Sequence, residues 1–160
     1  MALVVHKYGG SSLADAEKVR GVARRIIAAQ ERGDRVVTVC SAMGDATDDL
    51  LRLASEVSAR PAERELDVLL ATGETVSCAL VAMALNDMGH PAVSLTGLQA
   101  GIQTERAHGA ARIAEVSPKR IMAELEAGRL VVVCGFQGVT AEQEGTTLGR
   151  GGSDTKAVAL

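Results

Sequence analysis

Aromatic side chains and paired cysteines are almost missing from this chain. Its 160 residues include one Tyr, one Phe and no Trp, which argues against recognition of nucleic-acid bases by aromatic stacking. The three cysteines show no paired spacing, and the N-terminus is too poor in apolar residues for a secretory signal. We therefore expect a cytoplasmic protein with reduced thiols, in which Cys40 and Cys134 are small buried residues at the ends of apolar runs.

A large excess of charge of one sign is also missing. The formal net charge is −3, the isoelectric point is about 5.6, and the basic residues are scattered along the sequence. This pattern predicts neither a nucleic-acid partner nor an anionic membrane as a partner, and no segment approaches a membrane span. The three histidines lack ligand spacing, so no metal-binding residues are predicted. Any phosphate binding must therefore depend on local anion sites.

Apolar runs alternate with amphipathic stretches, and 47% of the residues are hydrophobic. This order predicts one α/β domain with a real core, in which helices cover a mostly parallel sheet. The predicted strands are Leu3–His6, Arg35–Cys40, Ala92–Leu95, Ala111–Val116 and Leu130–Cys134. Segment 139–147 is mostly polar and contains a glycine, which indicates a loop or a short hairpin.

Helical periodicity and capping residues predict the helices between these strands. The first helix should run from about Leu13 to Glu31 with Ser12 as its N-cap, and the second should begin near Thr47. A long helical region over Ala62–Met88 is expected to break near Thr72-Gly73. The last two helices should cover Ser117-Pro118 to Gly128 and Asp154 to Leu160. The first should bury Val19, Val22, Ala23, Ile26 and Ile27, and the second Leu50, Leu51, Ala54 and Val57.

Two glycine-rich loops lie at opposite ends of the chain, Lys7–Ser12 and Gly149–Asp154. The first follows an apolar run and opens a helical pattern, so its backbone N–H groups would face an anion, with Lys7 adding a positive charge. Glycine allows the backbone to approach phosphate oxygens closely. Either loop alone would most often be a simple turn.

The exact residue sequences of both loops and of the segments between them are a more specific signal than either loop alone. These segments are Lys7–Ser12, Cys40–Leu50, Leu70–Glu74, Thr96–Ile102, Gly135–Gly138 and Thr147–Thr155. Their ordered series resembles the aspartate kinases of the amino acid kinase family over the whole chain. The resemblance implies a three-layer αβα sandwich and the conversion of ATP and L-aspartate to ADP and 4-phospho-L-aspartate. That reaction is the first step toward lysine, threonine, methionine and diaminopimelate.

The resemblance also implies a role for each matching residue. Catalysis is assigned to Lys7 and Asp154. ATP phosphates are assigned to Lys7, Tyr8, Gly9, Gly10, Ser41, Gly151 and Gly152. Aspartate is assigned to Thr47, Glu74, Arg150 and Ser153. Mg²⁺ would be carried mainly by ATP phosphates and water, without a dedicated protein site.

Physical chemistry supports several of these roles. Glu74 lies in an apolar stretch and needs a cation, which the resemblance implies is the α-amino group of aspartate. The fork of Arg150 suits the α-carboxylate. Thr47 is equally an N-cap candidate, and Ser153 is a possible cap of the last helix. The acceptor β-carboxylate is ionised at neutral pH, so no strong general base is needed. Lys156 replaces a small hydroxyl residue common in relatives, and is either solvated or a change to the local charge.

Aspartate kinases continue beyond the second glycine loop, whereas this sequence stops inside a helical run. We therefore expect residues 1–160 to be the N-terminal part of a kinase catalytic domain. The rest of that domain and the regulatory ACT domains would be absent, the isolated piece inactive, and the parent oligomeric. Val158 and Leu160 should then be exposed. The alternatives are another member of the amino acid kinase family, or a non-catalytic module that binds aspartate or assists assembly.

Overall fold

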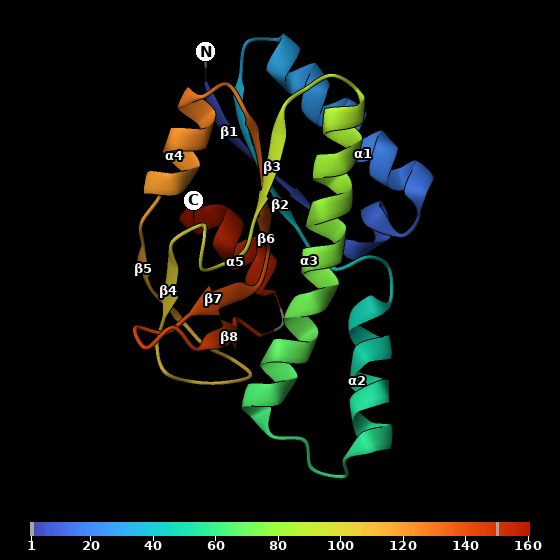
Figure 1. The fold of residues 1–160 in the computed structure, drawn as a ribbon, viewed down its shortest axis with the longest axis vertical. Helices are drawn as coiled ribbons and strands as arrows, with labels where there is room; N and C mark the ends of the chain where they lie inside the picture. The colour runs from blue at the N-terminus through green and yellow to red at the C-terminus, as the bar shows by residue number, and fades with distance from the viewer. Residues whose placement is uncertain (1, 150) are drawn as a thin grey trace.

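A parallel four-stranded sheet, sheet A, forms the centre of the computed structural model, which describes residues 2–149 and 151–160 (Figure 1). Its strands are β1 (Leu3–Tyr8), β2 (Arg35–Cys40), β3 (Ala92–Leu95) and β6 (Leu130–Cys134), in the order β1-β2-β6-β3. All four were predicted, and β1 is two residues longer than expected. The buried central strands β2 and β6 are valine-rich, as is typical of parallel strands covered on both faces.

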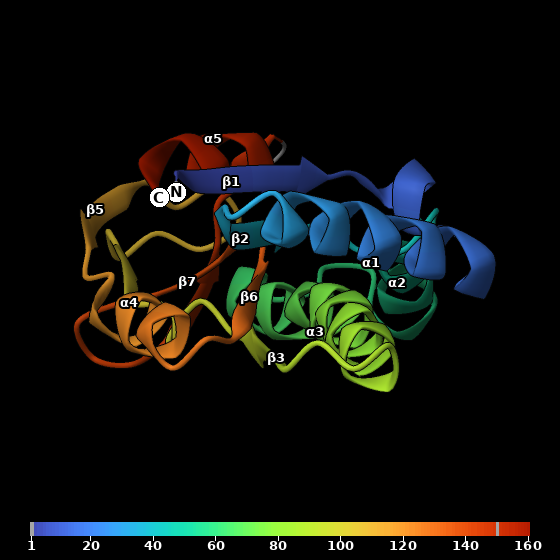
Figure 2. The same ribbon diagram turned by 90° about the horizontal axis from the view of Figure 1, so that it is seen from above.

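Helices cover both faces of sheet A and give the expected αβα layers (Figure 2). On one face lie α1 (Ala16–Glu31) and α3 (Glu63–Asp87), and on the other lies α4 (Lys119–Glu126). Alternation along the strands divides the core accordingly, because Val36 and Val132 pack toward α1 and α3 while Val37 and Val131 pack toward α4. The last helix, α5 (Gly152–Ala159), packs against β1 and β2.

A second sheet, sheet B, was not predicted as a separate unit. Its short strands are β4 (Ile102–Thr104), β5 (Ile113–Val116), β7 (Gln137–Val139) and β8 (Gly145–Thr147), in the order β5-β4-β7-β8. The predicted strand 111–116 therefore pairs antiparallel with β4 and does not extend the parallel sheet. The segment 139–147 does form a short hairpin, because β7 pairs antiparallel with β8.

Several predicted helix ends are wrong by a few residues. Ser12 lies inside a 3₁₀ turn, Gly10–Leu13, and α1 is capped by Asp15, whose carboxylate accepts from the Lys18 N–H at 2.8 Å. The predicted apolar face of α1 is nonetheless buried. In α4, Pro118 stands at the cap position rather than at the first helical position. Local sequence thus located these helices but not their first turns.

Two predictions about the middle of the chain fail because of packing. Helix α2 (Ala46–Val57) lies beside α3 at the edge of the molecule (Figure 1), and its Val57 is 83% exposed rather than buried, while Leu51 is also exposed. Helix α3 runs unbroken through Gly73. A Cβ on Gly73 would lie 3.1 Å from that of Ala42, so this glycine allows close packing and does not break the helix.

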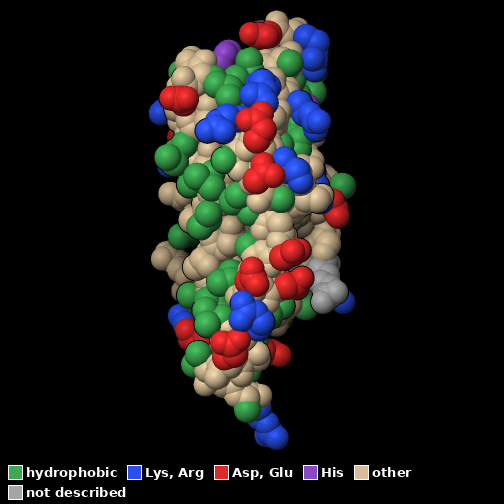
Figure 3. Space-filling model, turned by 90° about the vertical axis from the view of Figure 1, so that its right-hand side faces the viewer, with side chains coloured by type: hydrophobic (Ala, Val, Ile, Leu, Met, Phe, Trp, Pro, Cys, Tyr) green, Lys and Arg blue, Asp and Glu red, His purple; other side chains and the backbone are tan. Residues whose placement is uncertain are grey.

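The outer surface carries mixed charge, and Figure 3 shows acidic and basic side chains interspersed over the side formed by α1 and α2.

Among the described residues, α3 is the one helix long and apolar enough to cross a membrane by length and composition. The expectation that no segment approaches such a span is therefore wrong. The same properties are found in core helices, and α3 packs against sheet A.

At the C-terminus Val158 is 89% exposed as expected, whereas Leu160 is half-buried against the α4 side of the core.

Gly10 tests how tightly the first loop is packed. A Cβ there would lie 2.8 Å from the backbone oxygens of both Ala42 and Gly44, which cannot move aside as a flexible side chain would. We expect Gly10→Ala to lower the free energy of unfolding by about 1–3 kcal/mol in denaturant titrations. The control is Gly145→Ala, where an added Cβ meets no atom within 4 Å. Equal effects of the two substitutions would contradict this account.

Candidate active site

The loops after β1, β2 and β6 meet at the carboxyl edge of sheet A, where ligands of parallel sheets bind. The Ser41 N–H donates to the Tyr8 carbonyl at 3.0 Å, and the Gly135 N–H donates to the Cys40 carbonyl at 2.8 Å. The Gly44 N–H in turn donates to the Gly10 carbonyl at 2.9 Å. The sequence-predicted convergence of the three loops is therefore confirmed.

The second glycine loop joins this edge through α5. The Nζ atom of Lys7 lies 3.1 Å from the Oδ1 atom of Asp154, so residues from opposite ends of the chain form an ion pair. Strand alternation explains the contact, because Val5 and Lys7 share the face of sheet A opposite to that of Tyr8. The Asp154 side chain is 70% exposed. The pair therefore adds little stability and remains accessible to a ligand.

Glu74 lies in the middle of α3 and is completely buried. Both of its carboxylate oxygens accept from the backbone N–H of Phe136, at 3.0 and 2.8 Å, and Oε1 accepts from the Ser153 hydroxyl at 3.4 Å. Burial raises the pKa of Glu74 to about 7, although the Phe136 N–H, Lys156 and Ser153 all act to lower it. Glu74 is thus a satisfied but costly buried acid.

Ser153 faces inward and does not cap α5. The cap position belongs to Gly151, which has a φ of +78° that glycine adopts readily. This leaves the Ser153 hydroxyl free to accept from the Ser41 hydroxyl at 3.0 Å and to donate to Glu74. A chain of polar contacts therefore links the end of β2, the start of α5 and the centre of α3.

These contacts lie at a cleft of about 470 Å³. Its lining includes six of the predicted site residues, namely Ser41, Thr47, Glu74, Gly151, Gly152 and Ser153. Thr47 belongs to the first turn of α2, with Asp45 at the cap position, so its interpretation as an N-cap is wrong. Tyr8 does not belong to the described lining of the cleft. Its ring packs against the α1 side of the core, where burial raises its pKa. Arg150 lies outside the described residues.

Asp67 is a buried residue that the sequence analysis missed. It stands two helical turns before Glu74 on α3, and its carboxylate accepts from the Gly109 N–H at 3.1 Å and the Thr147 hydroxyl at 2.5 Å. His108 Nδ1 lies 2.9 Å from the same carboxylate. Gly109 and Thr147 both line the cleft. Asp67 therefore fixes one wall of the site, and the seven-residue spacing from Glu74 was the available signal.

The structure decides between the two interpretations of Lys156. Its side chain is completely buried, so the interpretation as a solvated cation is wrong. The ammonium donates to the carbonyls of Cys134, at 2.8 Å, and Gln137. Burial lowers its pKa to about 8, opposed by the nearby Glu74. Cys40, Cys78 and Cys134 are all buried free thiols, as expected for Cys40 and Cys134.

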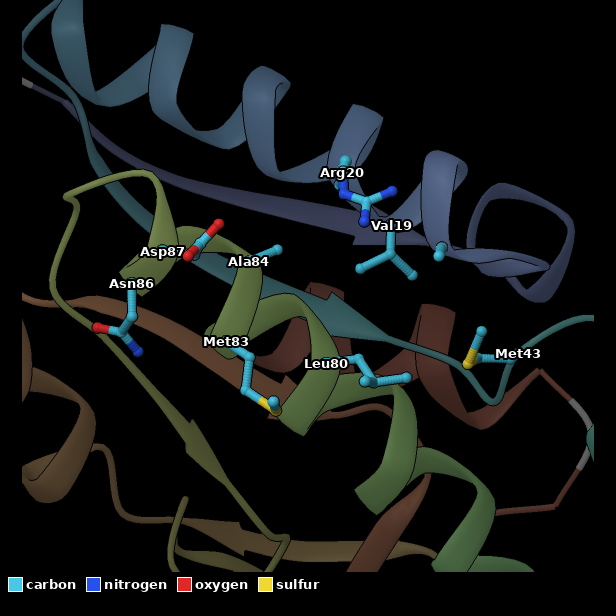
Figure 4. A pocket seen from close by; sticks show the side chains of 9 residues that line it. Val19, Arg20, Met43, Leu80, Met83, Ala84, Asn86 and Asp87 are labelled. Carbon is cyan, nitrogen blue, oxygen red and sulfur yellow. The ribbon is translucent and has the colours of Figure 1, made fainter.

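A larger depression lies elsewhere, between α1 and α3 (Figure 4). It has a volume of about 570 Å³ and is mostly apolar, with Val19, Met43, Leu80 and Met83 among its lining residues. The residues that line it include none of the predicted site residues. The smaller cleft at the strand ends is therefore the candidate active site, because polar and perturbed groups converge there. Within the described part of the chain, no group of three or more acidic, histidine or cysteine residues is placed to hold a metal.

Comparison with known proteins gives consistent matches. The sequence profile of the Amino acid kinase family matches residues 2–160. The chain is 58% identical over its whole length to the aspartokinase of Mycobacterium tuberculosis, and it spans 38% of the length of that relative. Its structure resembles the crystal structure of aspartate kinase from Synechocystis, with a TM-score of 0.82 and 46% identity over 98% of this chain and 26% of that one. The same fold is found in the crystal structure of Escherichia coli aspartokinase III in complex with aspartate and ADP. That structure matches with a TM-score of 0.83 and 22% identity over 99% of this chain and 47% of that one.

The raised pKa of Glu74 makes stability depend on pH. Unfolded Glu74 loses its proton near pH 4.5, whereas the folded protein keeps it to about pH 7. Between these values the folded state binds more protons, so the free energy of unfolding falls as pH rises. We expect the wild-type advantage over Glu74→Gln to fall by roughly 1–3 kcal/mol from about pH 5 to about pH 7 in denaturant titrations.

The control for this measurement is Glu63→Gln, which changes an exposed glutamate at the start of the same helix. Its stability profile should remain parallel to that of the wild type. A parallel profile for Glu74→Gln as well would show that Glu74 titrates normally and would contradict the account of its burial.

Proposed function

The chain belongs to the amino acid kinase family, and we propose that it forms the N-terminal part of an aspartate kinase catalytic domain that converts ATP and L-aspartate to ADP and 4-phospho-L-aspartate. The observation that carries the proposal is the buried Glu74 carboxylate, which lines a cleft beside the glycine loop that ends at Asp154. One end of this cleft offers a receptor for an amino group, and the Lys7–Asp154 pair offers charge for phosphoryl transfer.

Aspartate would bind in the buried half of the site. Its α-amino group would pair with Glu74, whose charge requires a cation in this setting. The hydroxyl of Thr47 lines the same cleft, and that of Ser153 is held by Ser41 and Glu74. Arg150 is followed by Gly151 and preceded by Gly149, both at the cleft, so its guanidinium is proposed to grip the α-carboxylate bidentately.

ATP would bind in the exposed half. Lys7, the backbone of Tyr8, Gly9 and Gly10, and the loop residues Ser41, Gly151 and Gly152 are proposed to hold its phosphates. An oxygen of the aspartate β-carboxylate attacks the γ-phosphorus, and the bond to the β–γ bridging oxygen breaks so that ADP leaves with that electron pair. Lys7 stabilises the charge that develops, and Asp154 orients Lys7 before the phosphates arrive.

No proton needs to be removed from the acceptor, because a carboxylate is already ionised at neutral pH. The exposed oxygen donors at Asp154 suit a Mg²⁺ ion that keeps phosphate and water ligands, and this ion would screen the phosphate charge. The chain spans 38% of the tuberculosis aspartokinase. We propose that the rest of the protein completes the nucleotide site and carries ACT domains in a cytoplasmic oligomer.

The direct test is an acceptor panel with the full-length protein that contains this chain. ADP release should depend on L-aspartate, and hydroxylamine should trap the product as an acyl hydroxamate. A preference for another acceptor would indicate a different member of the family. Calorimetric binding of aspartate without ADP release would instead indicate a binding module.

Lys7 and Arg150 should affect different kinetic constants in the full-length protein. We expect Lys7→Ala to lower kcat by roughly 100- to 1,000-fold with little change in the KM for aspartate, because charge on the transferring group develops in the transition state. Arg150→Lys should raise that KM by about tenfold with a smaller effect on kcat, because one bond of a bidentate pair is lost.

The matched control is Lys18→Ala, which removes an exposed lysine from α1. It should leave both constants unchanged. If Lys7→Ala and Arg150→Lys changed kcat and KM in the same proportion, the assignment of separate roles would be wrong.

A further inference from the structure

We propose that Lys156 is a positioning residue for the recognition of the substrate amino group: it fastens the corner between β6 and β7 that directs the Phe136 N–H toward Glu74. It also supplies a buried positive charge, called the resident cation below, that acts on that carboxylate without forming an ion pair with it. The inference rests on the proposed function, in which Glu74 binds the amino group of aspartate. It concerns a buried residue that is not among the residues lining the cleft.

The fastening follows from two hydrogen bonds of one ammonium. Cys134 is the last residue of β6 and Gln137 is the first of β7, so only Gly135 and Phe136 separate the two carbonyls that Lys156 binds. An ammonium has three donors and can bridge both carbonyls at once. The two hydrogen bonds therefore fix the length and direction of the two-residue link formed by Gly135 and Phe136.

The fastened corner carries the main contact of Glu74. Both carboxylate oxygens accept from the Phe136 N–H, and that N–H has its position set by the same two residues that Lys156 spans. A Cβ on Gly135 would lie 2.8 Å from the Cys40 carbonyl, so the corner is already pressed against β2. Ser153 and Lys156, three residues apart on one face of α5, thus act on one carboxylate, the first directly and the second through the corner.

Charge gives Lys156 its second role. Burial drives the Glu74 carboxyl toward its neutral form, which cannot pair with an ammonium group of a substrate. The charged Lys156 opposes this, and the other titratable groups close to both residues are the thiols of Cys78 on α3 and Cys134 on β6, whose raised pKa values keep them neutral. Because Lys156 donates to two carbonyls and not to the carboxylate, it does not occupy the oxygens of Glu74, which lines the cleft.

The test is the pH dependence of kcat/KM for aspartate in the full-length protein, compared among the wild type, Lys156→Met and Lys156→Arg. Loss of the resident cation should move the acid limb of the Lys156→Met profile upward by about 1 pH unit or more. Lys156→Arg keeps the charge and should keep the acid limb, even if its larger head lowers kcat. Lys119→Met, the same change at an exposed lysine of α4, is the control and should change nothing.

A Lys156→Met profile lowered equally at every pH, with its acid limb unmoved, would overturn the proposal and leave Lys156 a purely structural residue. If Lys156→Met does not fold, Lys156→Thr applies the same test with a small hydroxyl that water can accompany, and an unmoved acid limb there is equally decisive against it. Absence of aspartate-dependent ADP release in the wild type would overturn the proposed function and this inference together. If the wild type is active but the acid limb of the Lys156→Met profile does not move, only the inference about Lys156 is overturned and the proposed function stands.

Discussion

One buried carboxylate organises the functional edge of this molecule. Glu74 is completely buried in α3, where an ionised or unpartnered acid is costly, so the surrounding elements must supply it with donors and a cation. The Phe136 N–H comes from the corner after β6, and the hydroxyl of Ser153 comes from α5. Lys156, on the same helix as Ser153, adds a nearby buried positive charge that acts to lower the pKa of Glu74. Residues from α3, from the corner after β6 and from α5 thus meet at this one group.

The site divides into halves with different physical character. Around Glu74 and Asp67 the polar groups are buried and hydrogen-bonded to backbone atoms, so their geometry is fixed before any ligand arrives. Around Lys7 and Asp154 the charges are exposed, and their attraction is weak enough for an anion to replace it. Such an arrangement fits the proposed function, in which a small substrate is held by buried groups next to a phosphate chain that must enter and leave.

The sequence predicted the parallel sheet well because each strand of sheet A is a short apolar run bounded by turn residues. It also predicted that the loops after His6, Cys40 and Cys134 would meet at one edge, because they follow parallel strands, whereas Glu74 and Asp154 were assigned through the family resemblance. Sheet B was missed as a unit because strands of three or four residues, such as β4, are too short to show a period of two. The face of α2 was misread because periodicity identifies an apolar stripe but not the surface that covers it.

The environment of Lys156 lay beyond any sequence-based prediction. Nothing in the run from Asp154 to Leu160 distinguishes a solvated lysine from a buried one, because its partners are two backbone carbonyls that have no sequence signature. Asp67 differs, since its spacing of seven residues from Glu74 on an apolar helix did indicate a shared face. The spacing of two acids along one helix can therefore be read from the sequence, whereas the partners of Asp67, Glu74 and Lys156 include backbone groups that only the fold reveals.

The most direct test of this account is the ionisation of Glu74 itself, measured from the ¹³C chemical shift of its carboxyl carbon in the labelled protein as the pH is varied. We expect a transition near pH 7 in the free protein. With saturating L-aspartate the carboxylate should remain ionised to lower pH, because a bound ammonium favours the charged form. A transition at the ordinary value for glutamate, unchanged by aspartate, would contradict the claim that this buried acid is the receptor at the centre of the site.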